Sequence, residues 1–132
     1  MKYAIYIHKD ENSDYGVTVP DLAGCFSAGG TFEDALEQAQ EAILCHIEGL
    51  LIDGEKIATP SPMDSLVNNP QYTGGVWAVV DVDISQASGK AKRINITLPE
   101  NLLHSIDRFA ESRHETRSRL LATAAMEYMG KH

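Results

Sequence analysis

Three polar side chains in one short segment near the end of the chain are of types that can read DNA. Arg93, Asn95 and Thr97 alternate strictly with apolar residues up to Leu98, which predicts a half-buried strand. Successive side chains of a strand point to opposite faces, so the three polar ones share a face. Arginine can bond guanine, asparagine can bond adenine, and threonine can meet a base edge or a thymine methyl. The segment therefore predicts DNA base contacts.

Two helices are predicted to follow this strand. Pro99 suits the first turn of one helix, and Thr116 suits the N-cap of the next. Apolar residues recur at helical spacing in both: Leu102, Leu103, Ile106, Phe109 and Ala110, then Leu120, Leu121, Ala124, Ala125 and Tyr128. A unit of about forty residues is too small to bury a core alone. We therefore expect a second copy to complete it by pairing strands.

The start of the second helix is predicted to hold a DNA phosphate. Free backbone amides and the helix dipole converge there, and both favour an anion. Thr116, Arg117, Ser118 and Arg119 form this polar, basic start, and Lys92 adds a further cation beside the strand. These basic side chains predict a salt-sensitive attraction to the DNA backbone.

Residues 92–132 resemble a ribbon-helix-helix DNA-binding module. The alternating strand, Pro99 and the start at Thr116 fall at matching spacings. In that family two chains pair their strands into an antiparallel ribbon in the DNA major groove, and the second helix holds a phosphate. The resemblance implies a homodimer formed through residues 92–132, with dimers able to pair into a tetramer. The alternative is an ordinary edge strand packed on a helical hairpin.

The charge of the chain is divided between its two parts. The 132 residues have a net charge of −8, but residues 1–89 carry three basic and fourteen acidic side chains, a net of −11. Residues 90–132 carry eight basic and five acidic side chains, a net of +3. Such asymmetry points to two partners of opposite charge. We expect a domain at 1–84, a linker at 85–91 and a DNA-binding domain at 92–132.

The first domain is predicted to be an α+β sandwich with one helix across an antiparallel sheet. Strands are expected at 1–8 and 15–19 as a hairpin, then a loop at 20–30. Thr31 opens a long helix that ends before Asp53, and an irregular stretch at 55–62 leads to a helical turn at 63–69. A third strand at 75–83 is apolar on both faces and is therefore expected in the sheet interior.

This first domain resembles the HicB antitoxin family. The pattern Y-x-V-x-V-P-D-L-x-G-C over residues 15–25 and G-T-x-x-D-A over residues 30–35 carries the resemblance, with Ala23 where the family commonly has proline. It implies a degraded ribonuclease-H-like fold and an antitoxin that neutralises a small, basic, mRNA-cleaving toxin, HicA, by direct binding. It also implies autorepression of the operon, because these proteins end in a DNA-binding module.

Two surfaces of the first domain are candidates for toxin binding. One is the loop, and the other is the acidic outer side of the long helix, whose charge would steer a cationic partner. The candidate residues are Leu22, Ala23, Gly24, Cys25 and Phe26 in the loop, and Glu33, Glu37 and Glu41 on the helix. The sequence does not choose between them.

Catalysis by this chain is not expected. A ribonuclease-H-type nuclease gathers several carboxylates on two metals, yet the middle of the first strand has none and offers Ile5, Tyr6 and Ile7. No metal, cofactor or redox role is predicted, because Cys25 and Cys45 lack ligand spacing. No membrane span is apparent, so we expect a cytoplasmic protein, at the nucleoid when bound to its operator. The alternative is a ligand-sensing repressor or a residual hydrolase.

Overall fold

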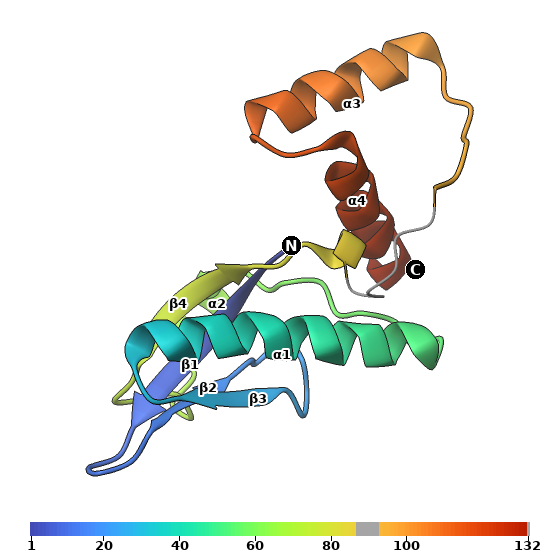
Figure 1. The fold of residues 1–132 in the computed structure, drawn as a ribbon. Coiled ribbons are helices and arrows are strands. Elements are labelled where there is room, and N and C mark those ends of the chain that lie inside the picture. Colours follow the sequence, from blue (N-terminus) through green and yellow to red (C-terminus); the bar gives the residue numbers. More distant parts are fainter. Residues whose placement is uncertain (87–92, 132) are drawn as a thin grey trace.

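The computed structural model describes residues 1–86 and 93–131 (Figure 1). The elements in chain order are β1 (Lys2–Lys9), β2 (Tyr15–Thr18), β3 (Phe26–Gly29), α1 (Phe32–Ile52), α2 (Met63–Val67), β4 (Val76–Asp81), the 3-10 turn η1 (Ile84–Gln86), α3 (Glu100–Ser112) and α4 (Arg117–Lys131). The strands form one antiparallel sheet in the order β3-β2-β1-β4, and α1 lies across one of its faces. The predicted antiparallel sheet with one long crossing helix is confirmed.

Strand β1 is the centre of the sheet and is buried on both faces. Tyr3, Ile5 and Ile7 are at most 2% exposed and pack with the buried residues of α1. Ala4 and Tyr6 lie on the opposite face and are 4% and 5% exposed. The pairing of β1 with β2, which aligns Tyr6 with Thr18, confirms the predicted hairpin. Because apolar residues occupy both of its faces, β1 suits a central position.

Two predictions about the sheet were wrong. The loop predicted over residues 20–30 contains a strand, β3, which pairs with β2. The sequence did not predict β3, because its residues Ser27, Ala28 and Gly29 have weak strand propensity and the strand depends on tertiary packing. A β-carbon on Gly29 would collide with the backbone of Ala35, so glycine allows α1 to approach the sheet closely.

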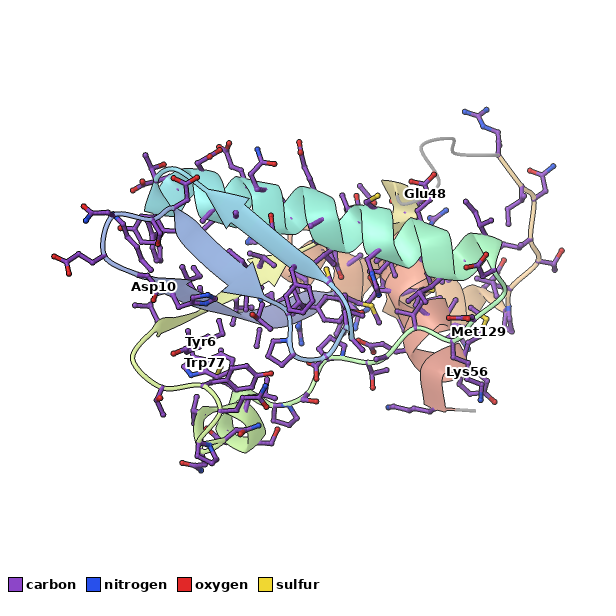
Figure 2. All side chains as sticks on the ribbon, turned by 90° about the horizontal axis from the view of Figure 1, so that it is seen from below. Tyr6, Asp10, Glu48, Lys56, Trp77 and Met129 are labelled. Carbon is purple, nitrogen blue, oxygen red and sulfur yellow. The ribbon has the colours of Figure 1, made fainter. Side chains whose placement is uncertain are left out.

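The second error concerns β4, which is an edge strand rather than an interior one. Its apolar residues Val76 and Val79 are 54% and 53% exposed. Trp77 packs against Tyr6 and Tyr72, with ring centroids 5.1 and 5.3 Å apart, on the sheet face away from α1 (Figure 2). The apolar character that suggested an interior strand thus serves a local aromatic cluster instead.

Helix α1 begins at the predicted cap and presents a narrow buried stripe. The Thr31 side chain accepts a hydrogen bond of 3.0 Å from the Asp34 amide, which satisfies a free N–H of the first turn. Spacing of four residues places one side chain per turn against β1. The stripe consists of residues that are 0% exposed: Ala35, Ala39, Ile43 and Ile47.

Helix α4 packs on the first domain, whereas α3 lies apart from the sheet (Figure 1). Met126 is 8% exposed and belongs to the same core as Ile57 and Ile84, with Ala122 packed beside it. We predicted a different apolar face for this helix, running from Leu120 to Tyr128, and Tyr128 is 68% exposed. The expected linker residues 87–91 lie outside the described residues, so the domain boundaries stay a prediction.

Replacing Met126 by alanine should destabilise the whole chain, because it empties a core position shared by α4 and the first domain. We expect a loss of about 2–5 kcal/mol in the free energy of unfolding, as for other buried methionines. Met129→Ala is the matched control: its side chain is 54% exposed, and it should change stability by less than about 0.5 kcal/mol. Urea unfolding at one protein concentration measures both. Equal effects would mean that α4 does not dock here.

Candidate functional site

The segment predicted to read DNA is extended and exposed. Arg93, Asn95 and Thr97 are all exposed, but so are Ile94 and Ile96, at 69% and 58%. The strand expected from Arg93 to Leu98 is not formed by the single chain, since residues 93–99 carry no regular structure. An isolated extended segment has no neighbour with which to form a ladder. The ribbon itself requires a second copy and stays a prediction.

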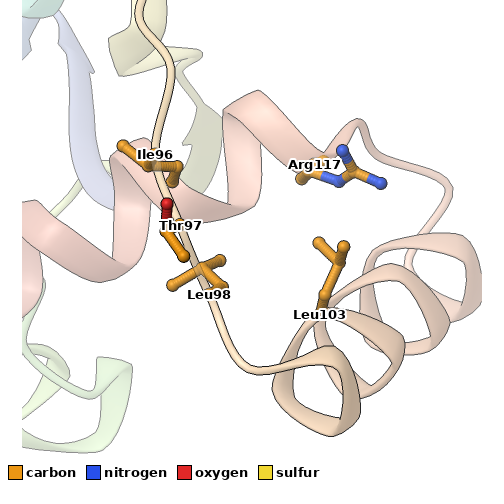
Figure 3. A pocket seen from close by; sticks show the side chains of 5 residues that line it. All are labelled: Ile96, Thr97, Leu98, Leu103 and Arg117. Carbon is orange, nitrogen blue, oxygen red and sulfur yellow. The ribbon is translucent and has the colours of Figure 1, made fainter.

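An open hollow separates this segment from the two helices that follow (Figure 3). It has a volume of about 320 Å³ and is lined by Ile96, Thr97, Leu98, Leu103 and Arg117. Apolar side chains of the segment and of α3 therefore border a space that the single chain leaves unfilled.

The start of α4 is capped as predicted. The Thr116 hydroxyl accepts a hydrogen bond of 3.1 Å from the Arg119 amide, which confirms Thr116 as the N-cap. Arg117 binds Asp107 of α3 through both Nε and Nη2, at 2.7 and 2.8 Å. This hydrogen-bonded pair lowers the pKa of Asp107 below its ordinary value and raises the pKa of Arg117.

Arg119 is paired with the first domain rather than held free for a phosphate. Its guanidinium lies 2.5 Å from Asp81 at the end of β4 and 3.7 Å from Glu115. The predicted cluster of phosphate-binding cations is therefore not assembled in this structure: Arg117 and Arg119 each face a carboxylate, while Ser118 is exposed. Lys92 lies outside the described residues.

The loop predicted to bind a toxin divides into a buried and an exposed part. Leu22 and Cys25 are each 3% exposed, so little of either side chain is open to a partner in the single chain, and their toxin contact stays a prediction. Three backbone hydrogen bonds among Val19, Leu22 and Cys25 close this tight turn, and burial raises the pKa of the Cys25 thiol. Ala23 and Gly24 are exposed, and Phe26 is 67% exposed.

The acidic side of α1 is a surface separate from that loop. Glu33, Glu37 and Glu41 are exposed and spaced four residues apart, so they share one side of the helix. Phe26 aligns with Thr18, and Thr18 aligns with Tyr6, which places Phe26 on the sheet face away from α1. The structure therefore does not bring the two candidate sets together.

Two carboxylates of the first domain, those of Asp21 and Asp83, accept hydrogen bonds within the chain. Asp21 accepts hydrogen bonds of 2.7 and 2.6 Å from Ser61, and Asp83 accepts bonds of 3.1 and 2.5 Å from Ser85. Within residues 1–86 and 93–131, no three His, Cys, Asp or Glu side chains converge as metal ligands. None of the helices in these ranges combines the length and hydrophobicity needed to cross a bilayer.

Sequence reasoning missed the role of Asp81 as a junction between distant parts of the chain. Its carboxylate lies 2.5 Å from Arg119 and 3.6 Å from the amino group of Met1. Gln40 of α1 donates a 2.5 Å hydrogen bond to the Asp81 backbone carbonyl. No linear pattern marks these contacts, because the partners are far apart in sequence.

Comparisons with known proteins agree with this architecture. A family model described as the HicB-like antitoxin of bacterial toxin–antitoxin systems matches residues 3–125. An uncharacterized 14.9 kDa protein from the rep-hol intergenic region of Haemophilus phage HP1 is 46% identical over 119 residues, covering 90% of this chain and 89% of that protein. The crystal structure of the Burkholderia pseudomallei antitoxin HicB superposes with a TM-score of 0.83 at 48% identity, covering 98% of each chain. A chain of the HicA3 and HicB3 toxin-antitoxin complex is 34% identical, with a TM-score of 0.57, and covers 63% of this chain and 99% of that one.

The pair of Arg117 and Asp107 should be visible as a pH effect. NMR titration should find the pKa of Asp107 below its ordinary value, and Arg117→Gln should return it upward, because the hydrogen bond lowers it. A carboxyl with a depressed pKa stabilises the fold above its unfolded pKa, and this contribution fades as pH falls through the folded pKa. Arg113→Gln is the control, since Arg113 stacks on Phe109 instead. An Asp107 pKa that ignores Arg117→Gln would contradict the pairing.

Proposed function

The chain belongs to the HicB-like antitoxin family of bacterial toxin–antitoxin systems, and from this premise we propose that it acts by binding rather than catalysis. Its first domain binds and blocks a small basic, mRNA-cleaving toxin of the HicA kind, and its C-terminal unit binds operator DNA to repress its own operon. The division of charge, −11 over residues 1–89 and +3 over residues 90–132, is the observation that carries both assignments.

The toxin assignment is supported by the likeness to the HicB3 chain of a toxin–antitoxin complex. An acidic domain speeds the approach of a cationic partner, but affinity comes from buried apolar anchors. Phe26 suits such an anchor, because it is a large aromatic side chain that is 67% exposed. Leu22 and Cys25 hold the turn beneath it. We therefore place the contact at Phe26, with the glutamates of α1 acting on the rate of association.

The toxin prediction separates the role of Phe26 in affinity from the role of the α1 glutamates in the rate of association. Phe26→Ala should raise the Kd for the cognate HicA-like toxin by about tenfold or more, since aromatic anchors dominate interfaces. Replacing Glu33, Glu37 and Glu41 by glutamine should mainly slow association and weaken its salt dependence. Ile52→Ala, at a side chain 77% exposed, is the matched control. Calorimetry and stopped-flow kinetics on co-purified partners measure these effects, and wild-type affinity in Phe26→Ala would exclude the anchor.

The DNA assignment is supported by the exposure of the apolar residues between the candidate base contacts. Ile94 and Ile96 are 69% and 58% exposed, and a second copy pairing along residues 93–98 would cover them. The polar set Arg93, Asn95 and Thr97 would then share the opposite face of a two-stranded ribbon, a shape that fits the major groove. Two-fold pairing predicts a palindromic operator.

The phosphate contacts can be made without breaking both ion pairs. An arginine carries five N–H donors, and the Asp107 contacts of Arg117 use its Nε and Nη2. Its remaining donors, the exposed Ser118 hydroxyl and the free amides of the α4 N-terminus can still meet a phosphate. Arg119 pairs with Asp81 through Nη2 and lies near Glu115 through Nε, so a phosphate would compete with these carboxylates for it. Lys92 and Thr116 complete the proposed set.

The DNA prediction distinguishes contacts to bases, which determine sequence preference, from contacts to phosphates, which do not. Asn95→Ala should cost about 1–3 kcal/mol of binding and relax preference at one base position, because one base contact is lost. Ser118→Ala should weaken all sequences about equally, since a phosphate contact carries no sequence information. Binding of the upstream DNA and of a panel of single-base variants, at fixed salt, measures both. Unchanged sequence preference after alanine replaces Arg93, Asn95 and Thr97 would rule out the ribbon as the reading element.

A further inference from the structure

The first domain holds the carboxylate of Asp81 in place beside the first turn of α4. Asp81 is the last residue of β4 and aligns with Lys2 of β1. Gln40 of α1 donates a 2.5 Å hydrogen bond to its backbone carbonyl. The turn η1, which begins at Ile84, packs against α4 (Figure 1). Elements on both sides of Asp81 therefore fix its position relative to α4.

Arg119 is the residue of α4 that meets this carboxylate, and its contacts are incomplete. It is the third residue of the helix, and its Nη2 lies 2.5 Å from Asp81 Oδ2. Its Nε is buried and makes no hydrogen bond within the part of the chain that the structure describes. The Glu115 carboxylate, at 3.7 Å from Nε, is too distant for one. Guanidinium groups bind anions best through two nitrogens at once. Arg119 is thus paired with Asp81 through one nitrogen only.

We propose that Asp81 competes with DNA phosphate for Arg119, so that the first domain lowers the DNA affinity of the C-terminal unit of the same chain. The inference rests on the proposed function, in which Arg119 contacts the DNA backbone. Carboxylates and phosphates bind the same N–H groups of a guanidinium. A phosphate that reached Arg119 in its present position would also lie beside the Asp81 carboxylate, and like charges at such a spacing repel. Arg119 must therefore leave Asp81 to bind DNA.

The other arginine of this helix shows a different arrangement. Arg117 donates Nε and Nη2 to Asp107 at 2.7 and 2.8 Å. Asp107 belongs to α3, so this pair lies within the C-terminal unit and moves with it. A carboxylate placed in this way can position an arginine for a phosphate. Asp81 instead ties Arg119 to the first domain, which the proposed function assigns to the toxin.

The competition should be modest in size and independent of DNA sequence. The side chains of Arg119 and Asp81 are 25% and 45% exposed, and an exposed pair changes an equilibrium by at most about fivefold. A ribbon dimer presents two such pairs, so the combined effect is roughly five- to twentyfold. Phosphate contacts carry no sequence information. The contact therefore lowers affinity for all DNA without changing the preferred sequence.

Removing the competing charge should tighten DNA binding. Asp81→Asn in the full chain should lower the Kd for the upstream DNA and for an unrelated duplex by the same factor, roughly five- to twentyfold at fixed salt. Asp83→Asn is the matched control: it removes the same charge two residues away, from a carboxylate that bonds Ser85. It should change the Kd by less than about twofold, because salt screens charges that do not touch. Weaker binding by Asp81→Asn, or an effect equal to the control, would overturn the proposal.

A double-mutant cycle tests the pair itself. Arg119→Gln should weaken DNA binding more in the Asp81→Asn chain than in the wild-type chain, because in the wild type part of the arginine's contribution is spent on leaving Asp81. If Asp81 positioned Arg119 for a phosphate, Arg119→Gln would cost less in the Asp81→Asn chain. Either that order or equal effects would contradict the competition.

A measurement on the unmodified chain does not depend on how the variants fold. The carbon-13 signal of the Asp81 side-chain carboxylate should shift when the upstream DNA is added, because Arg119 leaves it, while the signal of Asp83 stays in place. DNA binding with an unmoved Asp81 signal would refute the competition and leave the proposed function standing. If neither the wild type nor Asp81→Asn binds any DNA, the proposed function fails and this inference fails with it.

Discussion

Burial of β1 on both faces, by α1 on one side and by the aromatic cluster of Tyr6, Tyr72 and Trp77 on the other, is the constraint on which the rest of the structure depends. Tyr3 and Ile5 are 0% exposed and meet an α1 stripe of Ala35, Ala39 and Ile43 that is equally buried. Fully burying each large side chain contributes roughly 1.5–3 kcal/mol. Because β1 is central, β2 and β4 must flank it, and the sheet order leaves β4 with an open edge.

The attachment of α4 to this core combines two interactions of different strength. Burial of Met126 at 8% exposure holds the helix, since loss of a buried methionine typically costs about 2–5 kcal/mol. The pair of Arg119 and Asp81 is 25% and 45% exposed at its side chains, and exposed pairs contribute about 0–1 kcal/mol. The ion pair therefore orients the start of α4 rather than anchoring it, and Arg119 can exchange Asp81 for another anion at small cost.

The predictions that succeeded were those set by local signals. Thr31 and Thr116 carry capping hydroxyls, and helical or alternating spacing placed α1, α3, α4 and β1. The predictions that failed concern features that depend on tertiary contacts. Strand β3 is formed by pairing with β2, and β4 is an edge strand whose Trp77 packs in an aromatic cluster with Tyr6 and Tyr72. At the candidate sites, the local pattern included Phe26, which is exposed, but it could not foresee that Leu22 and Cys25 are buried. It also could not foresee that Arg117 pairs with Asp107 and that Arg119 pairs with Asp81.

The two parts of the chain differ in how complete they are alone. The first domain buries its core within one copy, whereas Ile94, Ile96, Leu102 and Phe109 are 46–69% exposed within about twenty residues. A monomer rarely leaves so much apolar surface open without a partner. On the proposed assignment, toxin binding needs one folded chain, while DNA binding needs two chains to meet and so depends on protein concentration. Neutralisation would thus persist as the antitoxin becomes scarce, and repression would be released first.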